Sequence, residues 1–397
     1  MSRSSRMNTL LKPPKMAWNA TDRRLLRAAG IQDLRAIAKK QVPRMVFDYC
    51  DGAADGEISL NRARDTFAGL EFQPSVLRDV SVVDTGRTVL GQRQRLPFVL
   101  APVGFNRVMH ADGESAVASV AEQFGVPYSV STLATTSLAD VAAAAPGGRR
   151  WFQLYFAEDR GMVKELLACA EEAGFDTILL TLDTPASVPR RRDIRNGLTI
   201  PPSMSLGTFA EAWLHPGYWM RQIRAGSPKP QVLAATGGSA ADMIKRVFNP
   251  RLCLDDVEWL RGVWYGRLVA KGVQSVADAG RVADLVDGVW LSSHGGRKLD
   301  RAPVPVELLP DVVDEVGDRV EVLVDTGITS GADIVAAIAL GATAAAVGRS
   351  YQYGLMAGGR RGVVRALEIL SREIEVTLKL LGVTAIDQLN RSHVRFR

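Results

Sequence analysis

A histidine and an arginine lie three residues apart in the stretch LSSHGGRKLD, residues 291–300, directly after an apolar run. His294 is one of four histidines in the chain, and an imidazole titrates near neutral pH, which suits it to general acid–base catalysis. Arg297 has a permanently charged guanidinium fork that can bind a carboxylate through two hydrogen bonds. The end of a predicted strand therefore brings a candidate base close to a candidate anion-binding group.

Residues that are mostly polar or glycine also follow the other apolar runs of the chain. They are Pro102, Val103 and Gly104 after the first run, then Ser131, Gln153, Tyr155, Thr181, Asp183, Arg190, Lys271, Asp325, Gly327, Gly348 and Arg349. The strands themselves are otherwise apolar, and random surface loops would not place hydrogen-bonding groups at so many consecutive strand ends. The pattern therefore predicts one shared site.

The elements that would position these residues alternate along the chain. Eight β-rich runs are predicted at residues 96–103, 128–134, 151–156, 177–183, 267–273, 288–294, 321–327 and 344–350. Helices are predicted at residues 113–124, 137–145, 161–173, 255–263, 276–285, 306–316, 331–340 and 362–381. Such alternation predicts parallel βαβ units, and eight of them predict an α/β fold of the (β/α)8 TIM-barrel type. Active sites in this fold lie at the carboxyl ends of the strands.

Two segments lie outside this repeat. Residues 1–30 are basic and contain prolines, which predicts a loosely held N-terminal arm, and residues 31–397 are predicted to form the barrel domain. The domain begins with an N-terminal helical segment around residues 31–50. The connection between Asp183 and Lys271, after the fourth strand, is much longer than the others. We expect it to form a long loop insertion over the barrel mouth.

The composition argues against several classes of function. The chain has 49 basic and 43 acidic residues, and the net charge of +6 comes from short clusters rather than from a basic stripe with interleaved aromatic residues, so nucleic-acid binding is not expected. Cys50, Cys169 and Cys253 lack metal-ligand or disulfide spacing, which predicts no metal site and fits a reducing cytoplasm. We find no signal peptide and no membrane-spanning run, while peripheral contact with the inner face of the cell membrane stays open.

The chemistry of the predicted strand ends favours a flavin. The residues after the seventh and eighth strands match the place where barrels commonly bind a phosphate group. Gln153, Thr181 and Lys271 offer hydrogen bonds to a heteroaromatic ring, and a buried ammonium needs an anionic partner such as a reduced flavin. A nicotinamide cofactor is less favoured because no GxGxxG follows a strand. A purely structural ion pair between Lys271 and Asp325 is the alternative.

Seven motifs resemble those of one enzyme family and cover nearly the whole chain after residue 30. They are PRMVFDYCDGAADGE, WFQLY, TLDTP, LVAKGV, SSHGGRKLD, LVDTGI and GRSYQYGLMAGG. On these motifs the chain resembles the FMN-dependent α-hydroxy-acid oxidase and dehydrogenase family, and within it the bacterial flavin-linked L-lactate dehydrogenases.

The resemblance implies a role for each matching residue. The implied substrate-binding residues are Tyr49, Tyr155, Arg190 and Arg297. His294 would be the active-site base, Asp183 its acidic neighbour, and Lys271 would stabilise charge on the reduced ring. The implied FMN-binding residues are Pro102, Val103, Gly104, Ser131, Gln153, Thr181, Lys271, Asp325, Gly327, Gly348 and Arg349.

The activity implied by the resemblance is the FMN-dependent oxidation of an L-2-hydroxy acid, with L-lactate and pyruvate as the expected pair. A quinone or cytochrome would accept the electrons, and the chain would form a homotetramer. Three alternatives stay open. They are an oxygen-using oxidase or monooxygenase of glycolate, mandelate-like or other 2-hydroxy acids, a nucleotide dehydrogenase or isomerase on the same barrel, and a non-catalytic flavin-binding barrel.

Four positions depart from the family pattern. Ser293 stands where Asn normally precedes the histidine, Lys298 where Gln is common, and Val103 where Thr commonly follows the proline. Thr329 stands where many members have an arginine near the phosphate. Loss of that arginine removes a charge-assisted contact, so we expect weaker FMN binding, or binding through Arg349 and helix-start N–H groups.

Overall fold

Eight parallel strands form a closed barrel in the structure, a computed structural model that describes residues 19–188, 190–197, 214–234 and 249–397. The strands are β4 (Phe98–Leu100), β5 (Tyr128–Ser131), β6 (Arg150–Leu154), β7 (Thr177–Thr181), β8 (Arg267–Val273), β9 (Gly288–Leu291), β10 (Glu321–Val324) and β11 (Ala344–Val347). Their order around the barrel is β10-β11-β4-β5-β6-β7-β8-β9. The predicted (β/α)8 fold is confirmed.

Most predicted strands extend two or three residues too far, because the polar residues that follow them are in loops; β8 ends where it was predicted to end. The strands themselves are apolar because both of their faces are covered. Inside the barrel, Trp151, Val269 and Trp290 are fully buried in a core of their own, separate from the larger core between the strands and the helices.

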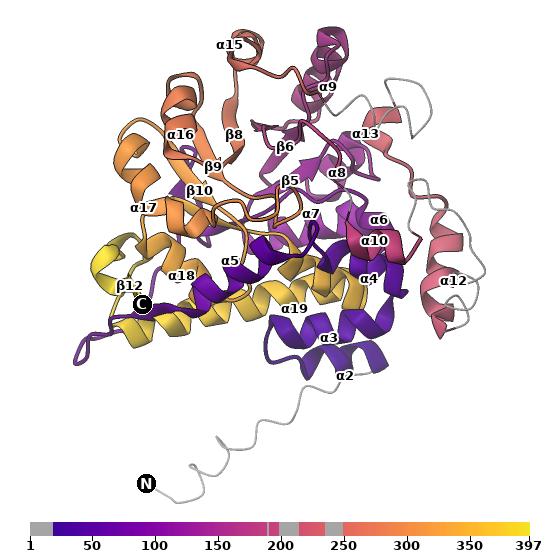
Figure 1. Cartoon of the computed structure of the whole chain (residues 1–397). Helices are drawn as coiled ribbons and strands as arrows, with labels where there is room; N and C mark the ends of the chain where they lie inside the picture. The colour runs from indigo at the N-terminus through magenta and orange to yellow at the C-terminus, as the bar shows by residue number, and fades with distance from the viewer. Residues whose placement is uncertain (1–18, 189, 198–213, 235–248) are drawn as a thin grey trace, which may run out of the picture.

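The helices around the barrel lie where the sequence predicted them, apart from the last. They are α7 (Gly113–Phe124), α8 (Leu138–Ala144), α9 (Arg160–Glu172), α15 (Leu254–Val263), α16 (Val276–Val282) followed by η1 (Ala283–Leu285), α17 (Pro305–Val316), α18 (Gly331–Ala339) and α19 (Arg349–Leu381). Figure 1 shows helices such as α9, α16 and α17 around the outside of the strands. The last helix begins directly after β11, and not at residue 362 as predicted. Gly358 and Gly359 have non-helical backbone angles, so α19 is two helices joined at a kink.

A hairpin closes the amino-terminal end of the barrel. It consists of β2 (Arg87–Val89) and β3 (Gln92–Gln94), which pair antiparallel. Val89 and Leu90 at its tip are buried in the inner core, and the Leu90 N–H donates to the Glu321 carboxylate at 2.7 Å. One mouth of the barrel is therefore blocked, and the carboxyl ends of the strands form the open end.

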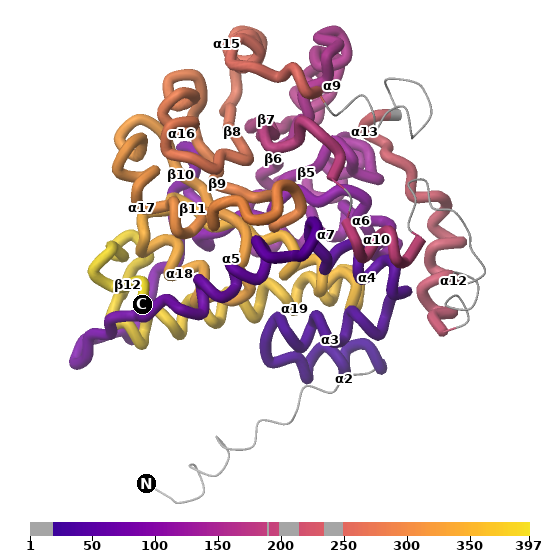
Figure 2. The backbone as a smooth tube through the Cα atoms, in the orientation of Figure 1, coloured from indigo at the N-terminus to yellow at the C-terminus, as the bar shows by residue number. Residues whose placement is uncertain are grey.

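The N-terminal helices pack beside the kinked C-terminal helix, as the indigo and yellow tubes of Figure 2 show. They are α2 (Ala20–Leu26), α3 (Ile31–Gln41) and α4 (Arg44–Asp51), and the next helix, α5 (Ile58–Ala68), packs on α17. A short strand, β1 (Leu70–Phe72), pairs with β12 (Val394–Phe396) near two 3-10 turns, η2 (Ile386–Gln388) and η3 (Arg391–His393). Helix α2 falls inside the predicted arm, but Leu25 and Ala28 are buried, so the chain is already packed there. The rest of that arm, residues 1–18, lies outside the described residues.

The insertion after β7 is helical in its described parts. These parts are α10 (Arg191–Arg195), α12 (Pro216–Ala225) and α13 (Gln231–Ala234), while residues 189, 198–213 and 235–248 lie outside the described residues. Helix α12 packs on α6 (Asn106–Met109), where the Tyr218 hydroxyl donates to the Val108 carbonyl at 2.7 Å. Helix α12 therefore lies beside α6, which follows the carboxyl end of β4. The predicted position of the insertion over the barrel mouth falls largely on residues outside the described ranges. Within those ranges no helix is long and apolar enough to span a membrane.

Candidate active site

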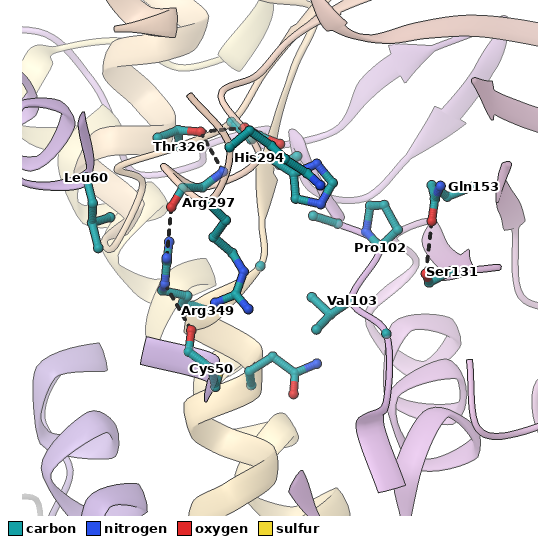
Figure 3. A pocket seen from close by; sticks show the side chains of 18 of the residues that line it. Cys50, Leu60, Pro102, Val103, Ser131, Gln153, His294, Arg297, Thr326 and Arg349 are labelled. Atoms are coloured by element: carbon teal, nitrogen blue, oxygen red, sulfur yellow. Dashed lines mark hydrogen bonds between the residues drawn. The ribbon is translucent and has the colours of Figure 1, made fainter. Parts of the chain in front are cut away.

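A cavity of about 430 Å³ opens at the carboxyl ends of the strands. Of the residues that the sequence predicted for the site, it is lined by Tyr49, Pro102, Val103, Gly104, Ser131, Gln153, Tyr155, Thr181, Arg190, Lys271, His294, Arg297, Asp325, Gly327, Gly348 and Arg349. Asp183 lies behind His294, outside the lining. In Figure 3, His294, Arg297 and Arg349 lie on one side of the cavity, and Ser131 and Gln153 lie on the other. The structure therefore brings the predicted residues together.

The backbone and the side chain of His294 are positioned by hydrogen bonds to two nearby residues. Its backbone is left-handed, with φ at 57°, a conformation that is uncommon outside glycine and concentrates at functional sites. Its N–H donates to the Ser292 hydroxyl at 2.9 Å, and its Nδ1 lies 3.2 Å from Asp183 Oδ1. Burial lowers the pKa of His294, although Asp183 opposes that shift, and Lys271 lowers the pKa further. The imidazole is therefore neutral at pH 7.

Asp183 is 2% exposed at its side chain. Burial alone would raise its pKa, but the electrostatic interaction and hydrogen bond with His294, together with the Lys271 ammonium, hold it below the ordinary value. The neighbouring Gly272 leaves room for this carboxyl group, because a Cβ there would lie 2.7 Å from Asp183 Cγ, and Gly272 has a φ of 101°. The carboxylate is therefore ionised and enclosed next to the histidine.

Two guanidinium groups stack on the ring of Tyr49. The Arg190 and Arg297 Cζ atoms lie 4.8 and 5.1 Å from the ring centroid. Arg297 Nη1 donates to the Tyr49 carbonyl at 2.6 Å and to the Gly52 carbonyl at 2.9 Å, which fixes the end of α4 against the loop after β9. Burial and the neighbouring Arg190 lower the pKa of Arg297 to about 10, so it stays charged at neutral pH. Such a cluster of cations is suited to an anionic ligand.

Lys298, one of the departures from the family pattern, also lines this part of the cavity. Burial lowers its pKa to about 8, with Asp183 opposing that shift and Arg190 and Arg297 lowering the pKa further. Below pH 8 the histidine therefore has a further positive charge close to it.

The opposite wall offers a connected row of hydrogen-bonding side chains. The Ser131 hydroxyl donates to Gln153 Oε1 at 2.9 Å, and Gln153 Nε2 donates to the Thr181 hydroxyl at 2.8 Å. In the barrel register, Ser131 pairs with Gln153 and Thr181 pairs with Lys271. These four residues therefore form a preorganised polar edge on consecutive strands.

Lys271 already has an anionic partner in the protein. Its Nζ lies 3.6 Å from Asp325 Oδ2 and 3.2 Å from the Ser292 hydroxyl, and Asp325 also accepts from the Trp290 indole at 3.0 Å. The alternative predicted from the sequence, an ion pair at the barrel rim, is thus present. Both side chains also line the cavity, so the Lys271 ammonium can contact a ligand there although it is paired with Asp325.

The cavity suits FMN, which has a polar heteroaromatic ring, a hydroxylated chain and a phosphate group. The row of donors and acceptors described above matches the ring edge. Within the described residues, two buried polar atoms of lining residues have no hydrogen-bond partner, Arg64 Nε and Gln352 Oε1. A ligand with both acceptor and donor groups would satisfy them.

Several lining residues were not predicted from the sequence. They include Cys50, Leu60, Arg64, Phe105, Met109, Leu133, Ser187, Val188, Thr326, Ile328 and Gln352. Cys50 reaches the cavity from α4 and not from a strand end, and burial raises its pKa to about 12, so it is a neutral thiol. Ser293, another departure, is buried and donates to the Thr326 hydroxyl at 3.2 Å.

Known proteins are similar to this chain over most of its length. A family model described as FMN-dependent dehydrogenase matches residues 38–396. A putative L-lactate dehydrogenase of Mycobacterium tuberculosis (strain ATCC 25618 / H37Rv) is 49% identical over 97% of this chain and 93% of its own length. An L-lactate dehydrogenase of Caulobacter sp. (strain K31) is 38% identical over 91% and 96%. The crystal structure of a monotopic membrane protein, (S)-mandelate dehydrogenase, matches with a TM-score of 0.90 at 34% identity, over 94% of this chain and all of that one.

Proposed function

The chain belongs to the FMN-dependent dehydrogenase family, and on that premise we propose that it oxidises L-lactate to pyruvate. Its family makes it an FMN-dependent oxidoreductase of 2-hydroxy acids. L-lactate is proposed because both relatives described above are named for it. The observation that best supports the reaction is the His294–Asp183 pair beside a cavity that Arg190 and Arg297 also line.

Substrate binding would depend on the cationic side of the cavity. Arg297 and Arg190 bind the carboxylate of the 2-hydroxy acid, with Tyr49 and Tyr155 beside it. Two guanidinium groups orient a carboxylate more strictly than one point charge does, which presents the carbon to be oxidised in one direction. The substrate's negative charge also relieves the repulsion between these cations.

His294 then acts as the general base. Because ionised Asp183 accepts the Nδ1 hydrogen, the lone pair of Nε2 is free to take the proton of the substrate hydroxyl. Asp183 stabilises the imidazolium ion that forms, as a buried carboxylate does for other catalytic histidines. The depressed pKa of His294 supports this role, since the neutral form is the one that accepts a proton.

The opposite wall would hold the cofactor. FMN, when bound, would supply the acceptor for the Cα hydrogen of the substrate and the two electrons that leave with it. Ser131, Gln153, Thr181 and Lys271 would hydrogen-bond its ring, and the Lys271 ammonium would offset negative charge there. The other residues proposed for FMN binding are Pro102, Val103, Gly104, Asp325, Gly327, Gly348 and Arg349.

We further propose a quinone or cytochrome as electron acceptor and peripheral contact with the cytoplasmic face of the cell membrane. In and just before α12, the side chains of Leu214, Met220 and Ile223 are 75%, 55% and 79% exposed, and Arg224 is exposed beside them. Exposed apolar residues with basic neighbours suit an anionic membrane surface. Flotation with anionic vesicles tests the contact, and light scattering tests the homotetramer, which stays a prediction.

A substrate panel followed by flavin absorbance tests the proposed function. Under anaerobic conditions L-lactate should bleach the yellow protein faster than glycolate, mandelate or D-lactate. Reoxidation by a quinone should then outpace reoxidation by oxygen. Faster bleaching by another hydroxy acid would identify that acid as the substrate in place of L-lactate. Faster reoxidation by oxygen than by the quinone would show that the protein is an oxidase. If no hydroxy acid bleaches the flavin, the protein is a non-catalytic flavin-binding barrel.

A further inference from the structure

The loop after β10 lacks the arginine that many family members place near the phosphate, because Thr329 occupies that position. The start of α18, directly after this loop, does not replace it. The Thr329 and Ser330 N–H groups donate to the Asp333 carboxylate at 2.8 and 2.9 Å, and the Gly331 N–H donates to Glu373 at 2.7 Å. These N–H groups are therefore already bonded to carboxylates within the protein.

Arg349 is also largely engaged. Its Nε donates to the Cys50 carbonyl at 3.2 Å, and its Nη2 donates to the Gly52 and Gly295 carbonyls at 2.9 and 2.8 Å. These bonds tie the start of α19 to the end of α4 and to the loop after β9. Arg349 still contributes a positive charge to the cavity, but three carbonyl oxygens direct its guanidinium group towards the protein.

Arg64 of α5 is placed differently. A Cβ at Gly327 would lie 2.8 Å from the Ala63 carbonyl oxygen and 3.0 Å from a ring carbon of Phe67, so α5 packs directly against the loop after β10. Arg64, on the same helix, lines the cavity together with Gly327 and Thr329. Its sequence position, in a helix far from the barrel strands, gave no sign of this role.

The guanidinium group of Arg64 lacks a partner. Its Nε is shielded from solvent without a hydrogen bond, and across the described ranges it forms neither an ion pair nor a hydrogen bond. A partly buried cation without a partner is unfavourable, and an anionic ligand in the cavity would offset that cost. The phosphate is the anionic end of FMN, and the loop after β10 is its expected location.

We propose that Arg64 binds the phosphate group of FMN and so replaces the arginine that is absent at position 329. The proposal rests on FMN being the cofactor, and it does not depend on which hydroxy acid is oxidised. A guanidinium on α5 would also couple cofactor binding to the packing of that helix on the barrel.

Binding of FMN and of riboflavin to flavin-free full-length protein tests this proposal, because riboflavin has the same ring but no phosphate. Quenching of flavin fluorescence gives both dissociation constants. Arg64→Met should raise the dissociation constant of FMN about 10- to 100-fold, the range for one charge-assisted contact, and leave that of riboflavin unchanged. Arg62→Met is the matched control on the same helix, since Arg62 is exposed and pairs with Glu307 at 3.7 Å; it should change neither constant.

The ratio of the two dissociation constants separates binding from folding. If Arg64→Met weakens FMN and riboflavin equally, or changes neither, the proposal is overturned. Should Arg64→Met fail to fold, Arg64→Lys serves instead, and it should weaken FMN binding by a smaller factor, again without affecting riboflavin. The ratio does not depend on whether the protein oxidises L-lactate. The role of Arg64 and the proposed substrate are therefore tested independently of each other.

Discussion

His294 Nδ1 and Asp183 Oδ1 lie 3.2 Å apart, and the carboxylate is almost fully enclosed. An ionised, enclosed acceptor at Nδ1 selects the tautomer whose Nε2 is unprotonated. The two residues come from the ends of different strands, β7 and β9, and are 111 residues apart in the chain. The barrel is therefore what makes them a pair.

Asp183→Asn should lower the rate of flavin reduction by about 10²- to 10⁴-fold, the range of general base catalysis. An amide can donate to Nδ1 and so favour the wrong tautomer. Anaerobic stopped-flow absorbance measures this rate directly. FMN content and the melting temperature should match those of the parent, and an unchanged reduction rate would contradict the role of Asp183.

The acid side of the pH profile should reflect His294. Its pKa is lowered by burial, with Lys298 among the charges that lower it further, so kcat/KM should stay constant through neutral pH and fall only below pH 6.5. Lys298→Gln removes one positive charge and should move this fall to higher pH. A shift in the opposite direction would show that Lys298 does not act on the histidine.

The alkaline side should reflect Lys298. Its pKa is about 8, and only its protonated form attracts an anionic substrate, so the KM for lactate should rise as the pH increases above about 8. In Lys298→Gln the rise should be absent, and the KM at pH 7 should already be higher than in the parent. Lys40→Gln, an exposed lysine on α3, is the control and should keep the parent profile. If the KM of Lys298→Gln still rises above about pH 8, another group is responsible for the rise.

The ion pair between Arg35 and Asp51 should stabilise α4, which positions Tyr49. Arg35 donates to both oxygens of the 1% exposed Asp51 carboxylate, at 2.6 and 2.8 Å. Arg35→Met should therefore destabilise the fold by about 1–3 kcal/mol, observed as a lower melting temperature. Arg44→Met, which breaks an exposed pair at 3.4 Å, should have almost no effect.

This stabilisation should depend on pH. Burial would raise the pKa of Asp51, but the hydrogen bonds from Arg35 and Tyr353 hold it well below the ordinary value. A depressed carboxyl pKa stabilises the fold above the unfolded pKa of about 3.9, and this contribution is lost as the pH falls towards the folded pKa. The difference in unfolding free energy between the parent and Arg35→Met should therefore become smaller below about pH 4. A constant difference would mean that the charge of Asp51 does not matter.

The barrel and most of its site could be predicted because both depend on local patterns. Each strand is a short apolar run, and the polar residue that ends it, such as Gln153 or Lys271, is visible in the sequence. Helix α5 was missed because only four of its eleven residues are buried, which leaves a weak apolar pattern. Arg64 lines the cavity because α5 packs against a loop that follows more than 250 residues later in the chain. A local sequence pattern cannot predict such a contact.

The engagement of individual donors was equally hidden. The resemblance placed Arg349 near the phosphate, but three carbonyl oxygens, from the end of α4 and from the loop after β9, accept hydrogen bonds from its guanidinium group. For Lys271 the sequence left two interpretations open, a ligand that balances its charge or an ion pair with Asp325, and the structure shows Asp325 3.6 Å away. Whether a polar group is free for a ligand depends on tertiary contacts.

The most direct test of the account is the rate of FMN reduction by L-lactate in His294→Gln, measured in a single anaerobic turnover with the cofactor bound. If His294 is the base, reduction should slow by about 10²- to 10⁴-fold while FMN affinity stays close to that of the parent. Reduction at the parent rate by a His294→Gln protein that still binds FMN would contradict the proposed mechanism.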